Sequence, residues 1–158
     1  MIDIVRFNVK NPVLGFTKVF NFNEFKIVEG GDDKKNRKVV EDKNVDILLS
    51  PEKTRDRDFM HSRNSGLNQV LCKLAKKNDI ANGFDFNLVL NSKNRGEILG
   101  RMMQNVGLCR KYKNKMVLLS GANNELDMRN PKDLVSFGIV LGMTPKEAKN
   151  ALNFKRIK

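Results

Sequence analysis

Hydrophobic residues recur along the chain in two ways, as short apolar runs and as longer stretches with an apolar residue every three or four positions. The short runs, which Asn, Pro and Gly interrupt, predict β-strands over residues 2–7, 13–20, 25–29, 45–50, 79–87 and 115–120. The longer stretches predict helices over 36–42, up to residue 77, over 94–112, and after residues 130 and 144. From residue 25 onwards strands and helices alternate, an order typical of βαβ units and of a parallel sheet.

Capping signals indicate where several helices begin. Ser62 or Asn64 is the predicted N-cap of the helix that ends near residue 77. Asn130 and Thr144 each stand directly before a Pro, which suits the first position of a helix. The second of these starts also has a Glu three residues after its cap, which completes a capping box.

The predicted fold class is therefore α/β, with about six strands in a TIM-barrel-like arrangement that is a shortened or incomplete (β/α) barrel. A complete (β/α)8 barrel takes about 250 residues, whereas this chain has 158. We expect residues 1–158 to form one such domain. Within it, 1–24 would contribute amino-terminal strands whose place in the sheet the pattern does not fix, and 154–158 would form a basic tail.

The net charge of the chain indicates which kind of partner it binds. Thirty Lys and Arg against 18 Asp and Glu give a formal net charge of +12, which predicts attraction to polyanions and above all to nucleic acid. No apolar run approaches the roughly 20 residues of a membrane span, and the first residues lack the layout of a secretion signal. Cys72 and Cys109 fall in helical patterns without metal-ligand spacing, which predicts reduced thiols and a cytoplasmic protein.

A long polar stretch between the strand at 45–50 and the next helix is crowded with basic residues. A loop of this length between two well-patterned elements is either functional or disordered, and we interpret it as functional. Other loops that follow strands add further basic residues, and Arg beside Asn and Ser suits structured RNA. The candidate RNA contacts are Arg37, Lys53, Arg55, Arg57, His61, Arg63, Asn64, Ser65, Lys93, Arg95, Arg129 and Lys132.

The usual signatures of an enzyme are missing from the sequence. His61 is the single histidine and cannot build a multi-histidine metal centre, so we interpret it as a polar loop residue or a phosphate or base contact. The turn at 30–32 lacks the layout of a nucleotide-binding loop. We therefore predict no catalytic residue and no metal ligand. Two alternatives stay open: a small TIM-like phosphoesterase with a metal held by carboxylates, and a scaffold that binds proteins and uses its charge only for solubility.

Five stretches carry a family resemblance: IVEGGDDKKNRKVVEDKNVDILLSPE, RNSGLNQVLCKLAKKNDIA, GRMMQNVGLCRKYK, MVLLSGA and RNPKDLVSFGIVLGMTPKEAKNAL. In this order they resemble the family of ribonuclease P protein component 3, the archaeal and eukaryotic 30-kDa-type subunit. The resemblance spans roughly residues 25–152. It implies a TIM-barrel-like fold related to the polymerase and histidinol phosphatase superfamily, without the metal-binding histidines of that superfamily.

The resemblance also implies a function. The family binds the catalytic RNA of ribonuclease P together with a small ribosomal-protein-like subunit, and helps that RNA to remove 5′ leaders from precursor tRNA, which the protein would meet indirectly. The RNA cuts with Mg²⁺, and the protein needs no cofactor of its own. Family motifs fall on Asn36 and Arg37, on Ser65 and Gly66, on Arg110, Lys111 and Lys113, and on Arg129, Pro131 and Asp133. Asn36 thereby joins the candidate RNA contacts.

The chain departs from the family pattern in two respects. Lys35, Asn82 and Asn114 stand where we expect apolar residues, and each would cost about 1–3 kcal/mol if it were buried without a partner. Family members are usually longer at the amino terminus, so early β/α units are expected to be reduced here.

Overall fold

The computed structural model describes residues 1–9 and 14–155. Six strands run parallel in two hydrogen-bonded sheets. The smaller sheet pairs β1 (Ile2–Val5) with β2 (Lys18–Asn21), and the larger sheet has the order β3 (Ile27–Glu29), β4 (Ile47–Leu49), β5 (Ala81–Asp85) and β6 (Met116–Leu119). The register pairs Ile47 of β4 with Ile27 on one side and with Ala81 on the other.

The two sheets meet where β1 lies beside β6. The backbone N–H of Gly121 donates to the carbonyl oxygen of Ile4 over 3.3 Å, and that of Arg6 donates to Ala122 over 2.8 Å. The strands therefore follow one another in the cyclic order of a barrel, from β1 and β2 through β3, β4, β5 and β6 back to β1. Among the described residues no ladder joins β2 to β3, so the barrel is open there. The predicted TIM-barrel-like α/β fold is confirmed.

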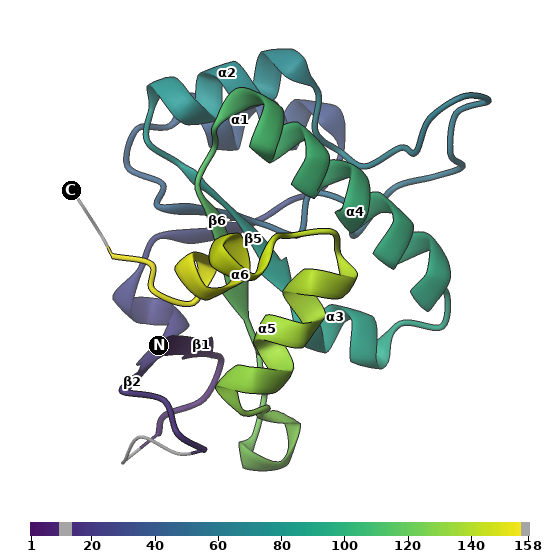
Figure 1. The fold of residues 1–158 in the computed structure, drawn as a ribbon. Helices are drawn as coiled ribbons and strands as arrows, with labels where there is room; N and C mark the ends of the chain where they lie inside the picture. Colours follow the sequence, from purple (N-terminus) through teal and green to yellow (C-terminus); the bar gives the residue numbers. More distant parts are fainter. Residues whose placement is uncertain (10–13, 156–158) are drawn as a thin grey trace.

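Helices cover the outside of the strands (Figure 1). They are α1 (Asp33–Glu41), α2 (Gln69–Lys77), α3 (Phe86–Asn91), α4 (Arg95–Tyr112), α5 (Pro131–Val140) and α6 (Pro145–Ala151), with short 3-10 turns η1 (Phe22–Glu24) and η2 (Glu125–Asp127). Among the described residues no helix combines the length and the apolar character that crossing a membrane requires.

Alternation along the strands divides the core in two, because successive strand side chains point to opposite faces. Ile47 and Leu49 of β4 face the inside of the barrel, whereas Leu48 faces the helices. The inner cluster is small and contains Ile4, Phe25, Ile47, Leu49, Ala81, Val117 and Leu119. The outer cluster lies between the strands and the helices and is much larger.

Several predicted element boundaries are wrong. The helix predicted from residue 36 begins at Asp33, and the strand predicted over 13–20 is β2, which begins at Lys18. The N-cap of α2 is Asn68, whose side-chain oxygen accepts from Val70 and Leu71, because Ser62 and Asn64 lie in the preceding loop. The strand predicted over 79–87 ends at Asp85, whose carboxylate caps the short helix α3. The caps of α5 and α6 are Asn130 and Thr144 as predicted, with the capping box at Thr144. Residue 13 of the second predicted strand and residues 156–158 of the predicted tail lie outside the described residues.

Candidate nucleic-acid interface

The loops that follow the strands share one end of the barrel, because all six strands are parallel. The largest of them, residues 51–67 between β4 and α2, projects from the body (Figure 1). We call residues 54–64 the projecting loop. Few of its side chains belong to the hydrophobic core, so polar contacts must account for its shape.

Asp58 organises the base of the projecting loop. Its Oδ1 accepts from Arg101 Nε at 2.8 Å and from the backbone N–H of Asn64 at 2.9 Å, and its Oδ2 accepts from Arg63 at 2.7 Å. Burial raises the pKa of Asp58, but the hydrogen bonds from Arg63, Asn64 and Arg101 outweigh that effect and bring the pKa to about 2. The carboxylate is therefore charged throughout the neutral range and holds two arginines in place.

Arg55 joins the projecting loop to the turn after β3. Its side chain is only 8% exposed. Its guanidinium donates to Asn64 Oδ1 at 2.6 and 2.8 Å, to the Gly31 carbonyl at 3.1 Å and to Asp33 at 2.6 Å. Most of its donors are therefore used inside the protein, and its role here is to position the loop.

Asn36 and Ser65 are buried, which corrects the expectation that they contact RNA directly. The Asn36 amide accepts from the Gly31 N–H at 2.8 Å and donates to the carbonyl oxygens of Gly31, Pro51 and Gly66. Gly66 has a φ of +78°, and a Cβ there would meet the Pro51 carbonyl oxygen at 2.1 Å, so only glycine fits. The side-chain oxygen of Ser65 accepts from Gln104 of α4. Both residues hold neighbouring loops together.

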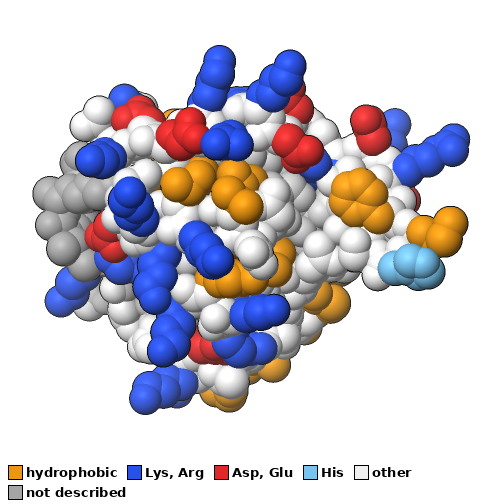
Figure 2. Space-filling view, turned by 90° about the horizontal axis from the view of Figure 1, so that it is seen from above, with side chains coloured by type: hydrophobic (Ala, Val, Ile, Leu, Met, Phe, Trp, Pro, Cys, Tyr) orange, Lys and Arg blue, Asp and Glu red, His pale blue; other side chains and the backbone are white. Residues whose placement is uncertain are grey.

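The tip of the projecting loop combines exposed apolar and basic side chains. Phe59 is 62% exposed and Met60 is 91% exposed. Arg57 and His61 on either side of them are also exposed and make no side-chain hydrogen bond or ion pair among the described residues. Figure 2 shows hydrophobic and basic side chains together on this protrusion, at the right of the view. An aromatic ring next to arginine and histidine side chains is a combination that stacks on unpaired bases and contacts phosphates.

Ion pairs occupy the mouth of the barrel at the same end. Arg6, which follows β1, lies 2.7 Å from Asp85 Oδ2 and 3.3 Å from Glu29 Oε1. Lys53 lies 2.8 Å from Glu29 Oε2. The hydrogen bond from Lys53 lowers the pKa of Glu29, whereas burial raises the pKa of Asp85 against the effect of Arg6. Two cations and two acids cancel, so the mouth offers a polyanion no excess of positive charge.

A cavity of about 520 Å³ opens above these ion pairs. Ser50 lines it with a positive φ of 48°, and its buried hydroxyl has no hydrogen-bond partner among the residues that the structure describes. Among the described residues, no three His, Cys, Asp or Glu side chains come together as they would around a metal ion. The described part of the mouth therefore presents amides, hydroxyls and paired charges.

The remaining predicted contacts lie on other loops and helix ends of the same side. Arg37 of α1 is exposed and pairs with Glu41 at 2.9 Å. Arg95 donates to the Leu90 carbonyl, and Arg129 lies over the Phe86 ring at 5.5 Å. Lys93 and Lys132 are exposed and make no ion pair within residues 1–9 and 14–155. The basic residues therefore divide into those that brace loops and those that stay available at the surface.

Comparison with known proteins establishes the family of this chain. Residues 13–156 match the family described as RNase P subunit p30. The chain belongs to the RNase P subunit p30 family.

Relatives within the RNase P subunit p30 family include ribonuclease P protein component 3 of Methanosarcina barkeri, 36% identical over 128 residues, which are 80% of this chain and 50% of the relative. The Thermococcus kodakarensis protein of the same name is 33% identical over 147 residues, covering 92% of this chain and 63% of that protein. A chain in the cryo-EM structure of archaeal ribonuclease P with mature tRNA aligns with a TM-score of 0.67 and 32% identity, covering 80% of this chain and 52% of that one. The chain thus spans roughly half the length of these relatives.

The chain also has site residues that the sequence did not predict. Arg101 is one of them, and its spacing from Ile98, Met102 and Asn105 does put it on the buried stripe of α4. Arg6 and Asp85 of the mouth are 79 residues apart, and no motif connects them. Phe59 and Met60 could have been noticed as apolar residues inside a basic loop.

Proposed function

We propose that this chain is a non-catalytic protein subunit of ribonuclease P that binds the catalytic RNA and supports removal of the 5′ leader from precursor tRNA. Its membership of the RNase P subunit p30 family carries the proposal. The similarity to a chain of archaeal ribonuclease P with mature tRNA supports it. A net charge of +12 supports an RNA partner, because neutralising phosphates releases counterions.

The projecting loop is the principal RNA contact in this proposal. Arg101 and Asp58 fix its base, so binding would not have to order a flexible segment first. Its tip presents Arg57, Phe59 and His61 to the outside. Cations would contact the RNA backbone and the ring would stack on a base, as single-stranded or looped RNA allows. Lys93 and Lys132 would add phosphate contacts from neighbouring loops.

In this proposal the RNA cleaves precursor tRNA with the help of Mg²⁺, and the protein supplies neither a cofactor nor a catalytic residue. It includes a small ribosomal-protein-like subunit as a second partner and precursor tRNA as an indirect one. A cytoplasmic location fits the two cysteines, which are buried and unbonded to each other.

Reconstitution tests the proposal. The chain is added to ribonuclease P RNA with the other protein subunits, and precursor tRNA cleavage is measured with and without it. We expect cleavage to rise when the chain is present. Binding to the RNA alone should weaken steeply as salt increases, since each neutralised phosphate contributes about 0.7–0.9 to the slope of log K against log salt.

A matched pair of variants localises the contact. Arg57→Glu reverses a loop-tip charge that makes no side-chain hydrogen bond or ion pair among the described residues, whereas Lys73→Glu reverses an exposed charge on α2. Arg57→Glu should weaken RNA binding about tenfold, and Lys73→Glu should change it much less. Equal effects of the two variants, or no effect of the chain on cleavage, would contradict the proposal. Chelator-sensitive hydrolysis of a simple phosphoester by the chain alone would instead favour a metal-dependent phosphoesterase.

A further inference from the structure

Both ends of the projecting loop are bound to one side chain of α4, that of Asn105. Its amide nitrogen donates to Glu52 Oε2 at 3.0 Å and to the Ser65 carbonyl oxygen at 2.9 Å. Glu52 lies shortly before the projecting loop, and Ser65 follows it directly. Asn105 therefore connects the start and the end of the loop to the same point of the helix.

Two oxygen atoms of this contact have no hydrogen-bond partner among the described residues. They are Glu52 Oε1 and Asn105 Oδ1, and both side chains are fully buried. While Glu52 is a carboxylate, both atoms can only accept, so neither can satisfy the other. A proton on Glu52 Oε1 makes that atom a donor, and a carboxylic acid and an amide then complement each other through two hydrogen bonds. The two unpaired acceptors therefore indicate that Glu52 carries a proton in the folded protein.

The charged and titratable groups around Glu52 favour the same protonation state. Burial has the largest effect and raises the pKa of Glu52 to about 8, and the negative charge of Asp85 at the end of β5 acts in the same direction. Arg101 of α4 favours the carboxylate, but its guanidinium is already bonded to three acceptors on the loop. Burial also raises the pKa of the Cys109 thiol of α4, which stays neutral. Within the described residues Glu52 forms no ion pair.

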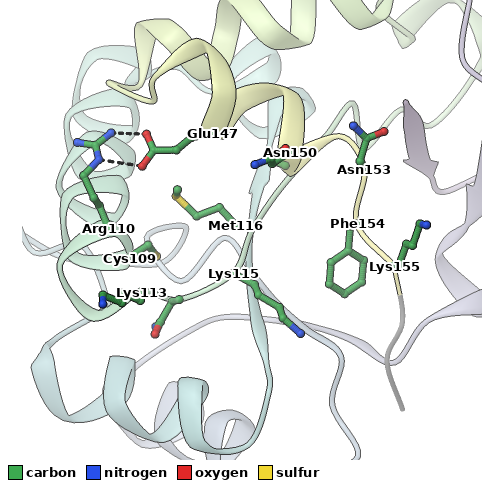
Figure 3. A pocket seen from close by; sticks show the side chains of 12 residues that line it. Cys109, Arg110, Lys113, Lys115, Met116, Glu147, Asn150, Asn153, Phe154 and Lys155 are labelled. Atoms are coloured by element: carbon green, nitrogen blue, oxygen red, sulfur yellow. Dashed lines mark hydrogen bonds and ion pairs between the residues drawn. The ribbon is translucent and has the colours of Figure 1, made fainter.

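The helix that carries Asn105 is anchored independently of Glu52. Near the carboxyl end of α4, Arg110 pairs with Glu147 of α6 through hydrogen bonds of 2.9 and 2.7 Å (Figure 3). The hydrogen bond from Arg110 lowers the pKa of Glu147 to about 2, and Asp58 at the base of the projecting loop is charged at neutral pH as well. These two acids therefore keep their charge through the neutral range and above it, where Glu52 loses its proton. A change of pH there acts on the contact between Glu52 and Asn105 and leaves the anchor of the helix unchanged.

We infer that Glu52 and Asn105 form a proton-dependent clamp, which holds the projecting loop on α4 while Glu52 is protonated and releases the loop when the proton is lost. The proton passes from Glu52 Oε1 to water, and a carboxylate oxygen then faces the Asn105 amide oxygen without a donor between them. Asn36 of α1 still donates to the carbonyl oxygens of Pro51 and Gly66 and has no proton to lose, so the loop is released on the side of α4 while the protein stays folded. For its consequence, that RNA binding weakens as pH rises, this inference rests on the proposed function.

Hydrogen exchange of single backbone amides tests the clamp in the full chain without RNA. The N–H groups of Arg63 and Asn64 in the projecting loop donate to Gln104 and Asp58 and are protected while the loop is closed. Between about pH 7 and about pH 9 their protection factors should fall about tenfold, because burial in the closed form raises the pKa of Glu52 from 4.5 to about 8. In Glu52→Gln the glutamine amide supplies a donor and an acceptor at every pH, so these protection factors should change less than about twofold.

Two measurements on the unmodified chain separate the clamp from a general loss of stability, and neither needs the variant to fold. The N–H groups of Lys132 and Asp133 donate to Asn130 at the start of α5, and opening of this cap does not involve Glu52, so their protection factors should change less than about twofold. The carboxyl carbon of Glu52, followed by NMR, should titrate at about pH 8. An equal fall at α5 and in the projecting loop, an equal fall in Glu52→Gln, or titration of Glu52 below about pH 6 would overturn the inference.

Binding of ribonuclease P RNA at the same pH values separates this inference from the proposed function. The apparent affinity falls with the fraction of protein in the binding form, so between about pH 7 and about pH 9 the original chain should lose at least about threefold more affinity than Glu52→Gln. If the loop amides respond to pH through Glu52 while the RNA affinity does not, the clamp stands and the projecting loop is not the RNA contact. If the RNA binds and the loop amides do not respond, the clamp is wrong and the proposed function stands.

Discussion

Arg101 of α4 donates from Nε to Asp58 Oδ1 across 2.8 Å and so ties the long helix to the base of the projecting loop. Its other nitrogens donate to the carbonyl oxygens of Arg55 at 3.2 Å and Asp56 at 2.6 Å. One buried guanidinium thus satisfies three acceptors on a segment with few hydrophobic contacts. The loop that we propose as the RNA contact therefore takes its shape from a residue that RNA would not touch.

Arg101→Met tests this dependence. Methionine keeps the helix and much of the side-chain volume but removes one of the three donors to Asp58 and the arginine donors to two carbonyl oxygens. We expect a loss of about 3 kcal/mol in the free energy of unfolding and faster amide hydrogen exchange over residues 55–64. Arg95→Met on the same helix removes an exposed arginine and should cost less than about 1 kcal/mol. Equal losses in both variants would show that Arg101 does not hold the loop.

Glu52 makes stability fall as pH rises. It is fully buried, and burial raises its pKa from 4.5 to about 8, although Asn105 donates to it. The folded protein therefore keeps a proton on Glu52 between about pH 4.5 and pH 8, where the unfolded chain has released it. Burial also raises the pKa of Asp3 from 3.8 to about 6, which acts in the same direction at lower pH. Between about pH 6 and pH 8 the slope should approach 1.4 kcal/mol per pH unit.

Urea unfolding at a series of pH values measures this slope, and Glu52→Gln is the matched variant. Glutamine keeps an acceptor for Asn105 and cannot ionise, so the slope above about pH 6 should flatten. At about pH 8 the variant should be at least as stable as the original chain. An unchanged slope would mean that Glu52 is not the group responsible.

Asn82 is a buried polar residue that the protein would be more stable without. In the part of the chain that the structure describes, its side-chain oxygen and nitrogen have no hydrogen-bond partner except the nearby Cys109 thiol, which is a weak one. Asn82→Leu keeps the volume and removes the unpaired amide, so the free energy of unfolding should rise by about 1–3 kcal/mol. Asn105→Leu is the control, because that amide donates to Glu52 and to the Ser65 carbonyl. The control should lose stability, and a loss in both would contradict the prediction.

The exposed tip of the projecting loop should matter for binding and not for folding. Phe59→Ser and Met60→Ser remove apolar surface that the core does not use. Thermal unfolding should stay the same within about 0.5 kcal/mol. Under the proposed function, affinity for ribonuclease P RNA should fall by about 1–3 kcal/mol for Phe59→Ser. Leu126→Ser, at another exposed apolar residue, is the control and should leave RNA affinity unchanged.

The strands could be predicted from the sequence because buried parallel strands are apolar on both faces. Most helices could be predicted as well, and the caps at Asn130 and Thr144 are local signals that mark where two of them begin. The sequence did not indicate α3, because the run Phe86–Asn91 has the composition of a strand, and its cap at Asp85 is recognisable only once the strand is seen to end there. Lys35 is exposed, whereas Asn82 and Asn114, also expected to be apolar, are buried. Within the described residues the Asn114 amide has no hydrogen-bond partner and the Asn82 amide has only the weak one of the Cys109 thiol.

The candidate site was harder to predict, because arginines on one loop look alike in a sequence. Arg55 is nearly buried by Asp33 and Asn64, whereas the Arg57 side chain makes no hydrogen bond or ion pair with any described residue. What separates them is the position of Asp33 and Asn64 in space, and no local pattern contains that information. Arg101 meets Asp58 across 43 residues for the same reason.

The contact between β1 and β6 affects how the protein folds while it is being synthesised. Asp3 and Ser120, which meet there, are 117 positions apart in the chain. Contacts between such distant segments slow folding, because a large loop must close before they form. During translation β1 and β2 would emerge from the ribosome long before their neighbour exists, and their exposed edges would need to be kept from pairing wrongly. Assembly of a working particle would accordingly wait for synthesis of the region around residue 120.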